Sequence, residues 1–270
     1  MSVTTESFDG LVVPHDIART IINTGLAGAP VFSTFTRRTT DSNAVVFPTA
    51  EPDGFDWVAQ LGPIPDVDPH DSAVVVSPAK LGGLLLLSNE SIADSAFPIA
   101  DELGRMIKDS MAPKADRDIL YGNPNPAAPT ALFDSLDTAT GPTLRAAVVD
   151  AAASIMGAGG SPSHVLLSPA LWAAEMERRE DTPHVTGPLL ADLGLNLTVT
   201  VAATLQDSDA LVIDKSGCFG VVRSDYTIEA SREAAQAWTH DGISLRVLAR
   251  LAATIPAPDK HARAVAVGSA

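Results

Sequence analysis

The stretch between Val31 and Val76 restricts the fold more than any other part of the chain. It has almost no helical period, and proline, glycine and aspartate interrupt it repeatedly. β-rich pieces alternate with these breaks, which predicts a long, irregular two-stranded ribbon. The predicted strands are 31–36, 44–47, 55–59 and 72–76. With about 15 residues in each arm at ~3.3 Å per residue, the ribbon would reach about 50 Å.

Aromatic side chains on this ribbon need a surface that covers them. An isolated two-stranded ribbon is only marginally stable in water, so it cannot hold exposed rings in place by itself. The aromatic residues of the stretch are Phe32, Phe35, Phe47, Phe55 and Trp57. In a monomer the ribbon would fold back on its own domain, whereas in an assembly it would lie on an adjacent chain.

The composition indicates an acidic, folded protein. The 270 residues include 18 Lys and Arg against 33 Asp and Glu, which gives a net charge of −15. Tight nucleic-acid binding depends on Lys and Arg that neutralise phosphates, so this balance argues against such binding as the main role. Hydrophobic residues make up 46% of the chain and charged residues 19%, which excludes a disordered protein. An ordinary acidic cytosolic protein would fit the same numbers.

The single cysteine and the hydropathy pattern indicate a reducing compartment. Cys218 has no partner for a disulfide within the chain, and we expect it to be a buried, inert thiol. The N-terminus lacks the apolar core of a signal peptide, and no apolar run approaches the roughly 18 residues of a membrane span. We therefore expect synthesis and assembly in a reducing cytoplasm and no membrane partner.

The remainder mixes helices and strands without a βαβ repeat, which predicts an α+β fold. Helices are expected at 14–27, 98–119, 143–156 and 168–179. Strands are expected at 195–201, 210–213, 219–222, 226–230 and 243–251. Pro113 falls inside the longest helix, where proline removes a hydrogen bond and predicts a kink or a break.

No motif predicts an enzyme, a cofactor or a metal site. Ser77 and Lys80 have the Ser-x-x-Lys spacing of penicillin-recognising enzymes, but the serine ends a Val-Val-Val strand and no Lys-Thr-Gly motif exists. The acidic cluster at 66–71 lacks the glycine and glutamate of an EF-hand and is interpreted as a polar turn at the ribbon tip. The six histidines show no zinc-type pairing. Arg37 and Arg38 are interpreted as a solvated pair rather than a phosphate clamp.

Five short motifs, in their order along the chain, resemble the major capsid proteins of tailed bacteriophages with the Hong Kong 97 fold. They are Trp57–Pro65, Ser77–Leu81, Leu87–Ser95, Leu166–Trp172 and Asp241–Arg250. The family has a Glu-Gly pair in the first motif, where this chain has Gln60 followed by Leu61-Gly62. Each motif alone is a weak signal. The resemblance covers roughly residues 10–256 and depends on the occurrence of all five motifs in the order that the family has.

The resemblance implies a domain organisation. It comprises an N-terminal arm with a short helix (1–30), an extended loop (31–80), a peripheral domain with a long spine helix (81–135 and 213–270) and an axial domain (136–212). The extended loop would lie over a neighbouring subunit. The inter-subunit contacts expected from this loop are Phe35, Arg37, Arg38, Phe47, Phe55, Trp57 and Ile64.

The same resemblance implies a structural protein rather than an enzyme, without a cofactor. Copies would form the hexamers and pentamers of an icosahedral shell that encloses the double-stranded DNA of a tailed phage without sequence-specific binding. A portal is an expected partner. A separate scaffolding protein is expected as well, because only about ten residues precede the family-like start. Some members join subunits through a lysine of the extended loop, but this loop has no lysine between Val31 and Ala79, so we expect no such bond.

Three alternatives remain open from the sequence. An encapsulin-type shell shares the fold but encloses a cargo enzyme instead of a genome. A small hydrolase with an unrecognised Ser/His/Asp set would be a monomer or a small oligomer. A phage tail or decoration protein would form rings or trimers rather than shells.

Overall fold

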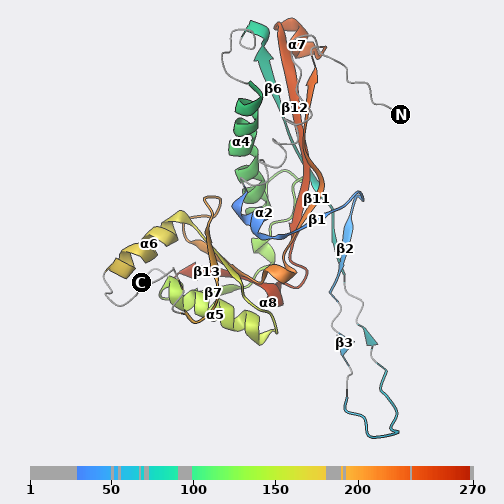
Figure 1. Ribbon diagram of the computed structural model, residues 1–270, viewed down its shortest axis with the longest axis vertical. Helices are drawn as coiled ribbons and strands as arrows, with labels where there is room; N and C mark the ends of the chain where they lie inside the picture. The colour runs from blue at the N-terminus through green and yellow to red at the C-terminus, as the bar shows by residue number, and fades with distance from the viewer. Residues whose placement is uncertain are drawn as a thin grey trace.

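The computed structural model describes residues 29–49, 52–53, 56–66, 68–69, 73–90, 99–180, 190, 193–231 and 233–267. These residues form two separate sheets with their helices and a long two-stranded ribbon (Figure 1). The predicted helix at 14–27 and the predicted contact Phe55 lie outside the described residues.

The first sheet has four strands in the order β1-β11-β12-β6. Its strands are β1 (Thr36–Thr39), β11 (Phe219–Ser231), β12 (Gly242–Thr254) and β6 (Ala79–Ser88). The long helix α4 (Ile99–Tyr121) lies along one face (Figure 1), where Ala115 and Ile119 share a core with Ala249 and Leu251. The short helix α2 (Pro30–Thr34) packs against α4. The hairpin between β11 and β12 carries α7 (Ala235–Thr239).

The second sheet has five strands in the order β7-β13-β10-β8-β9. Its strands are β7 (Thr138–Gly141), β13 (Ala262–Val267), β10 (Asp209–Ile213), β8 (His164–Leu167) and β9 (Thr198–Val201). Helix α5 (Leu144–Gly157) packs on β7 and β13, and Val148 and Ile155 belong to a core that is separate from that of the first sheet. Helix α6 (Pro169–Glu180) follows β8.

The ribbon extends away from both sheets and projects beyond the rest of the molecule (Figure 1). It consists of two antiparallel strand pairs. Strand β2 (Val45–Pro48) pairs with β5 (Ala73–Val76), and β3 (Pro52–Asp53) pairs with β4 (Asp68–Pro69). Short 3-10 helices at Phe133–Ser135 (η1) and Lys215–Gly217 (η3), together with α8 (Pro258–His261), complete the described elements.

The predicted starts of the helices at 143 and 168 and several predicted strands are confirmed. Thr143 caps α5 by accepting a hydrogen bond from the amide of Ala146 at 3.2 Å. Ser168 caps α6 in the same way for Leu171, with Pro169 in the first helical position. The strands at 44–47, 72–76 and 243–251 are present with shifted ends.

Other predictions are wrong at the start of the ribbon. The segment predicted as a strand at 31–36 is helix α2 followed by β1, and β1 joins the four-stranded sheet instead of the ribbon. The paired ribbon therefore runs from Val45 to Val76 and is shorter than the predicted loop at 31–80. Residues 56–59 form no strand.

Three further differences concern single elements. Helix α4 continues through Pro113 without a break. The strands predicted at 219–222 and 226–230 form one strand, β11, whose register shifts between Val222 and Thr227. The predicted domain division assigns 213–270 to one unit, whereas β13 pairs with β10 and β7 in the second sheet because its apolar residues complete that core.

Candidate protein interface

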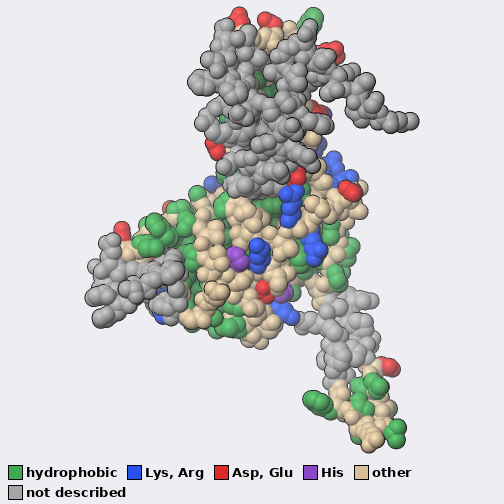
Figure 2. Space-filling view, in the orientation of Figure 1, with side chains coloured by type: hydrophobic (Ala, Val, Ile, Leu, Met, Phe, Trp, Pro, Cys, Tyr) green, Lys and Arg blue, Asp and Glu red, His purple; other side chains and the backbone are tan. Residues whose placement is uncertain are grey.

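The end of the ribbon carries three large apolar side chains that no described residue covers. Trp57 and Leu61 are fully exposed, and Ile64 is 83% exposed. Figure 2 shows this end as hydrophobic and neutral surface with one acidic group beside it, at the lower right of the view. A tight turn shapes it, since the amide of Gly62 donates to the carbonyl of Ala59 at 2.8 Å and Leu61 has a φ of 65°. Solvent-exposed apolar side chains in a projecting group indicate an interaction site.

The turn position corrects the interpretation of the acidic cluster at 66–71. The tip of the ribbon turns at 59–62, whereas Asp68 lies in strand β4 opposite Asp53. Proline at 63 and 65 and the left-handed residue Leu61 favour the turn earlier in the chain.

The aromatic residues at the base of the ribbon are covered by their own chain, which is one of the two possibilities that the sequence leaves open. Phe32 and Phe35 lie in the core beneath the four-stranded sheet. Phe47 is 9% exposed and stacks on Phe219 with ring centroids 4.8 Å apart. Phe35 is therefore a core residue, and Phe47 anchors the ribbon to strand β11. Of the predicted contacts that the structure describes, Trp57 and Ile64 are the apolar ones left exposed.

Arg37 and Arg38 hold strand β1 and the ribbon base to β11. The guanidinium Nη2 of Arg37 lies 2.6 Å from Oδ2 of Asp225, and its side chain remains partly exposed. The guanidinium of Arg38 lies 5.4 Å from the ring centroid of Phe219, within the range of a cation–π contact. Both arginines are thus engaged inside the chain rather than simply solvated.

The ribbon is acidic throughout. Between Thr39 and Ala79 the chain has seven acidic residues and no lysine or arginine. They are Asp41, Glu51, Asp53, Asp56, Asp66, Asp68 and Asp71. A partner of the ribbon should therefore offer apolar and cationic groups together.

The face of the four-stranded sheet opposite α4 combines cations with exposed leucines. We call it the open sheet face and define it by Lys80, Leu84, Leu86, Arg246 and Arg250. Leu84 is 72% exposed and Leu86 is 40% exposed. The sequence analysis missed this surface because the register that brings β6 and β12 together cannot be read from either strand alone.

Asp116 connects the N-terminal segment to helix α4, a role that the sequence analysis also missed. Its side chain is fully buried, and its two oxygens accept hydrogen bonds from the amides of Val31 at 2.9 Å and Phe32 at 3.0 Å. These amides belong to the first turn of α2, where helical N–H groups lack partners within the helix. Burial raises the pKa of Asp116 to about 6, against the opposing effect of these hydrogen bonds.

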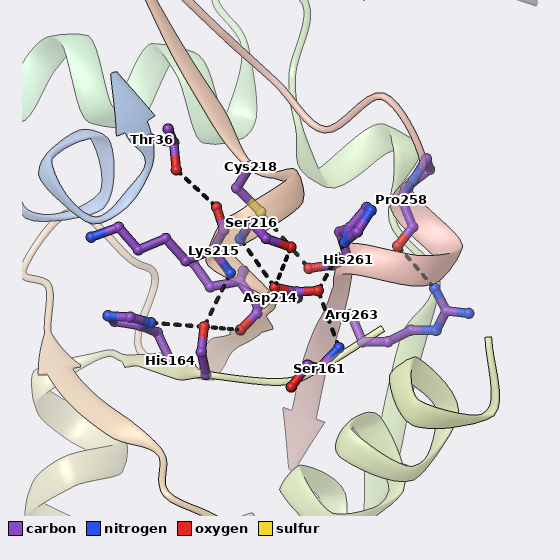
Figure 3. Close-up of polar contacts among 12 residues, drawn as sticks. Thr36, Ser161, His164, Asp214, Lys215, Ser216, Cys218, Pro258, His261 and Arg263 are labelled. Carbon is purple, nitrogen blue, oxygen red and sulfur yellow. Dashed lines mark hydrogen bonds and ion pairs between the residues drawn. The ribbon is translucent and has the colours of Figure 1, made fainter. Parts of the chain in front are cut away.

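A second cluster of polar contacts, which we call the joint, lies where two chain connections between the sheets meet (Figure 3). Asp214, between β10 and η3, accepts hydrogen bonds from the Ser161 amide at 3.1 Å and the Ser216 hydroxyl at 2.7 Å. Nδ1 of His261, at the end of α8, lies 3.0 Å from Oδ2 of Asp214. Burial alone would raise the pKa of Asp214, but the hydrogen bonds of Ser161, Ser216 and His261 together hold it below its usual value.

Gly217 leaves the space that the His261 ring occupies in this joint. A Cβ at this position would lie 2.1 Å from Cγ of His261, so the ring packs directly on the glycine backbone. The joint lies where the chain passes from β10 of the five-stranded sheet to β11, and where it passes from β12 back to β13. Cys218 beside it is buried, as predicted, and burial raises the pKa of its thiol.

Three features of the described part of the chain concern metal sites, membrane spans and the Ser-x-x-Lys motif. It contains no group of three or more His, Cys, Asp or Glu side chains arranged to bind a metal ion. Among its helices, none has both the length and the apolar character needed to cross a membrane. Ser77 and Lys80 lie before and within the extended strand β6 rather than on one turn of a helix.

Comparisons with known proteins agree with this architecture. The family model described as "Phage capsid family" matches residues 9–260. A solved structure from Mycobacterium phage Adephagia is 18% identical, with 90% of this chain and 91% of that chain covered and a TM-score of 0.72. The capsid of a native GTA particle is 14% identical over 100% of this chain and 95% of that chain, with a TM-score of 0.68.

A virus-like particle from Pyrococcus furiosus is a weaker match. It is 11% identical over 94% of this chain and 98% of that chain, with a TM-score of 0.59. Comparison with curated protein sequences gives no significant match. The structural matches confirm the predicted α+β, Hong Kong 97-like fold. The chain belongs to the phage capsid family and is a structural protein of a capsid shell.

Proposed function

We propose that this protein is the major capsid subunit of a tailed phage. Copies of it assemble into the hexamers and pentamers of an icosahedral shell that encloses double-stranded DNA. The observation that carries the proposal is the projecting ribbon, whose Trp57, Leu61 and Ile64 side chains need a covering surface that the described chain does not provide. The ribbon of each subunit then lies over its neighbour.

The two sheets take different places in this shell. The four-stranded sheet with α4 forms the peripheral domain, and the five-stranded sheet with α5 and α6 forms the axial domain around the capsomer centre. The Asp214–His261 contact ties together the two chain connections that link the sheets. Helix α5 and one face of the five-stranded sheet have a core of their own, which supports this division, whereas Leu166, Leu211 and Ile213 on the other face of that sheet share the core of the four-stranded sheet.

Repeated burial of the ribbon tip supplies cohesion. Full burial of one large apolar side chain contributes roughly 1.5–3 kcal/mol, so three such side chains contribute about 5–9 kcal/mol per contact before ordering costs. Because every subunit makes and receives one such contact, a closed shell is stable without any strong single bond.

The net charge of −15 suits a protein that lines a DNA-filled space. Like charges on the wall and on the packed genome disfavour adhesion, so DNA is held by enclosure rather than by binding. A scaffolding protein and a portal act as assembly partners in the bacterial cytoplasm, and the product resides in the virion.

Expression of the chain followed by sedimentation and negative-stain electron microscopy tests the proposal. In the absence of the scaffolding partner we expect capsomers or shells from the wild type, and unassembled subunits from the triple variant Trp57→Ala, Leu61→Ala, Ile64→Ala. Val149→Ala, an exposed apolar position on α5, serves as the control outside the ribbon. If the wild type stays a monomer, or the triple variant forms shells as efficiently as the wild type, the proposed role of the ribbon is wrong.

A further inference from the structure

We propose that the free edge of strand β6 is a self-association site, at which the β6 strands of two copies of this chain pair antiparallel about a two-fold axis. The contact joins the two four-stranded sheets into one continuous sheet. It does not involve the ribbon, so the inference goes beyond the proposed function and can be tested on subunits that form no shells. It commits to one occupant of the edge, namely β6 of a second copy.

Strand β6 is the outer strand of its sheet, with β12 on one side and no described strand on the other. Its pairing with β12 runs from Ala79 to Ser88 without a register shift, and it contains no proline and one charged side chain, Lys80. Proteins protect exposed edges by short strands, charges, prolines or bulges. The strand at the opposite edge, β1, has four residues, two of which are arginines. Strand β6 lacks such protection over most of its length, and an edge of this kind is a template for another strand.

The hydrogen-bond pattern shows which backbone groups of β6 face outward. Ser88 lies opposite Gly242, and the amide of Asn89 donates to the carbonyl of Asp241 at 3.1 Å. This bond marks Ser88 and Gly242 as a non-hydrogen-bonded pair, whose own N–H and C=O groups point away from the partner strand. The same alternation along β6 gives outward-facing backbone groups at three further positions, namely Gly82, Leu84 and Leu86. Among the described residues no backbone group pairs with them, so they are free to bond to a second strand.

The side chains of the edge match a second copy of the same strand. Leu84 is 72% exposed and Leu86 is 40% exposed. When Leu84 of one copy lies opposite Leu86 of the other, the leucines of the two copies cover one another, and the two-fold axis makes this contact twice. In that register Gly82 lies opposite Ser88, two small residues that leave the backbones free to approach.

Charge favours the antiparallel orientation. Lys80 lies at the start of β6, Glu90 follows two residues after its end, and both are exposed. The register that pairs Leu84 with Leu86 brings Lys80 of each copy to Glu90 of the other. A parallel arrangement would place like charges side by side. The net charge of −15 opposes contact between two copies in general, whereas one cation and one anion balance along this edge.

Helix α4 leaves room for the second strand. It packs over β12, where Ala115 and Ile119 share a core with Ala249 and Leu251. In the joined sheet the α4 helices of the two copies are separated by three strand spacings of ~4.8 Å, about 14 Å in all. Helices in contact lie about 8–10 Å apart, so the two helices do not collide.

Proline at an outward-facing position tests the contact without breaking the sheet. Leu84→Pro removes an N–H that does not bond to β12, and an edge strand tolerates proline where its nitrogen faces solvent. Leu85→Pro is the matched neighbour, because its N–H faces β12 and its loss should destabilise the fold. Leu84→Lys with Leu86→Lys blocks pairing in a second way, by placing like charges across the contact. Val149→Lys is the control for a charge added at an exposed apolar position on α5.

Sedimentation equilibrium of these variants, made in the triple ribbon variant, measures the dissociation constant of the dimer. We expect dimers from the triple ribbon variant itself and from Val149→Lys. Leu84→Pro and the double-lysine variant should each weaken the dimer at least about tenfold, which corresponds to ~1.4 kcal/mol. A triple ribbon variant that stays monomeric at all concentrations, or dimers that both blocking variants leave unchanged, would overturn the inference.

Thermal unfolding checks the hydrogen-bond pattern on which the inference depends. Leu85→Pro should lower the melting temperature clearly more than Leu84→Pro does. Equal decreases would show that the amide of Leu84 bonds to β12 and would also overturn the inference.

Cysteine crosslinking tests the symmetry of the contact in the otherwise unchanged chain. Leu84→Cys with a short bis-maleimide should give covalent dimers and no higher species, whereas Val149→Cys in unassembled subunits should give none. Ladders beyond the dimer from Leu84→Cys would show a contact without two-fold symmetry and would contradict the inference.

The other possible occupant of the edge is an extended segment of a different protein. If Leu84→Pro leaves the sedimentation of the subunit unchanged but lowers the yield of shells, the edge receives such a segment and the inference is wrong. A wild type that forms dimers but never larger assemblies would refute the proposed function and support the inference.

Discussion

Replacing Asp116 by alanine should detach the first described segment of the chain from helix α4. The carboxylate is fully buried and holds the amides of Val31 and Phe32 at 2.9 and 3.0 Å. Its loss leaves two buried N–H groups without acceptors, at about 1–3 kcal/mol each. The gross destabilisation is therefore about 2–6 kcal/mol.

The raised pKa of Asp116 reduces this figure. A carboxyl with a pKa of about 6 in the folded protein and ~3.9 in the unfolded chain costs about 3 kcal/mol when it is ionised at pH 7. Alanine removes that cost, so the net loss of stability at pH 7 should be at most about 3 kcal/mol. Between pH 4 and pH 6 the folded protein binds the extra proton, and its stability therefore decreases as the pH rises through this window.

Urea unfolding of the unassembled subunit, followed by circular dichroism, measures the effect. The free energy of unfolding of the wild type minus that of Asp116→Ala should decrease as the pH rises from about 4 to about 6 and should stay constant above pH 6. Asp118→Ala is the matched control on the same helix, since the partly exposed pair of Asp118 with Lys114 should contribute less than about 1 kcal/mol. Equal midpoints for wild type and Asp116→Ala at pH 4, or a difference that grows with pH, would refute the reasoning.

Three further predictions concern the ribbon base and the joint. Phe47→Ala should cost about 3–5 kcal/mol, because the ring is buried against Phe219, and thermal unfolding should show it. Gly217→Ala should lower the melting temperature, because the added methyl group would overlap the His261 ring. In a His261→Ala background the same substitution should cost much less, because the ring is gone. Equal decreases in melting temperature in both backgrounds would contradict the geometry. The lowered pKa of Asp214 stabilises the folded state above the unfolded value of ~3.9, and that contribution disappears as the pH falls through the folded value. Acid unfolding of Asp214→Asn should therefore depend less on pH below 4 than that of the wild type.

Local signals were sufficient for the elements whose stabilising contacts are close in sequence. The capping residues Thr143 and Ser168 mark the starts of α5 and α6 correctly, because a cap and its helix are adjacent in the chain. The segment at 31–36 was mispredicted because its β-branched and aromatic residues favour a strand locally, while Asp116 caps it as a helix from a distant part of the sequence.

The candidate interface shows the same limit. The sequence indicates that the ribbon carries aromatic residues, but it does not reveal which of them are covered. In the structure Phe47 stacks on Phe219, whereas Trp57 is fully exposed. The open sheet face depends on the pairing of Arg246 with Leu84 across strands that are far apart in the chain. Such surfaces become visible only when the register of the sheet is known.

The solvent exposure of Trp57 before and after assembly tests the central claim most directly. A variant with Trp172→Phe and Trp238→Phe retains Trp57 as its single tryptophan and reports on the ribbon tip alone. The account predicts red-shifted, easily quenched emission from the isolated subunit, and blue-shifted, protected emission once shells have formed. Emission that stays fully exposed in closed shells, or that is already protected in the monomer, would contradict it.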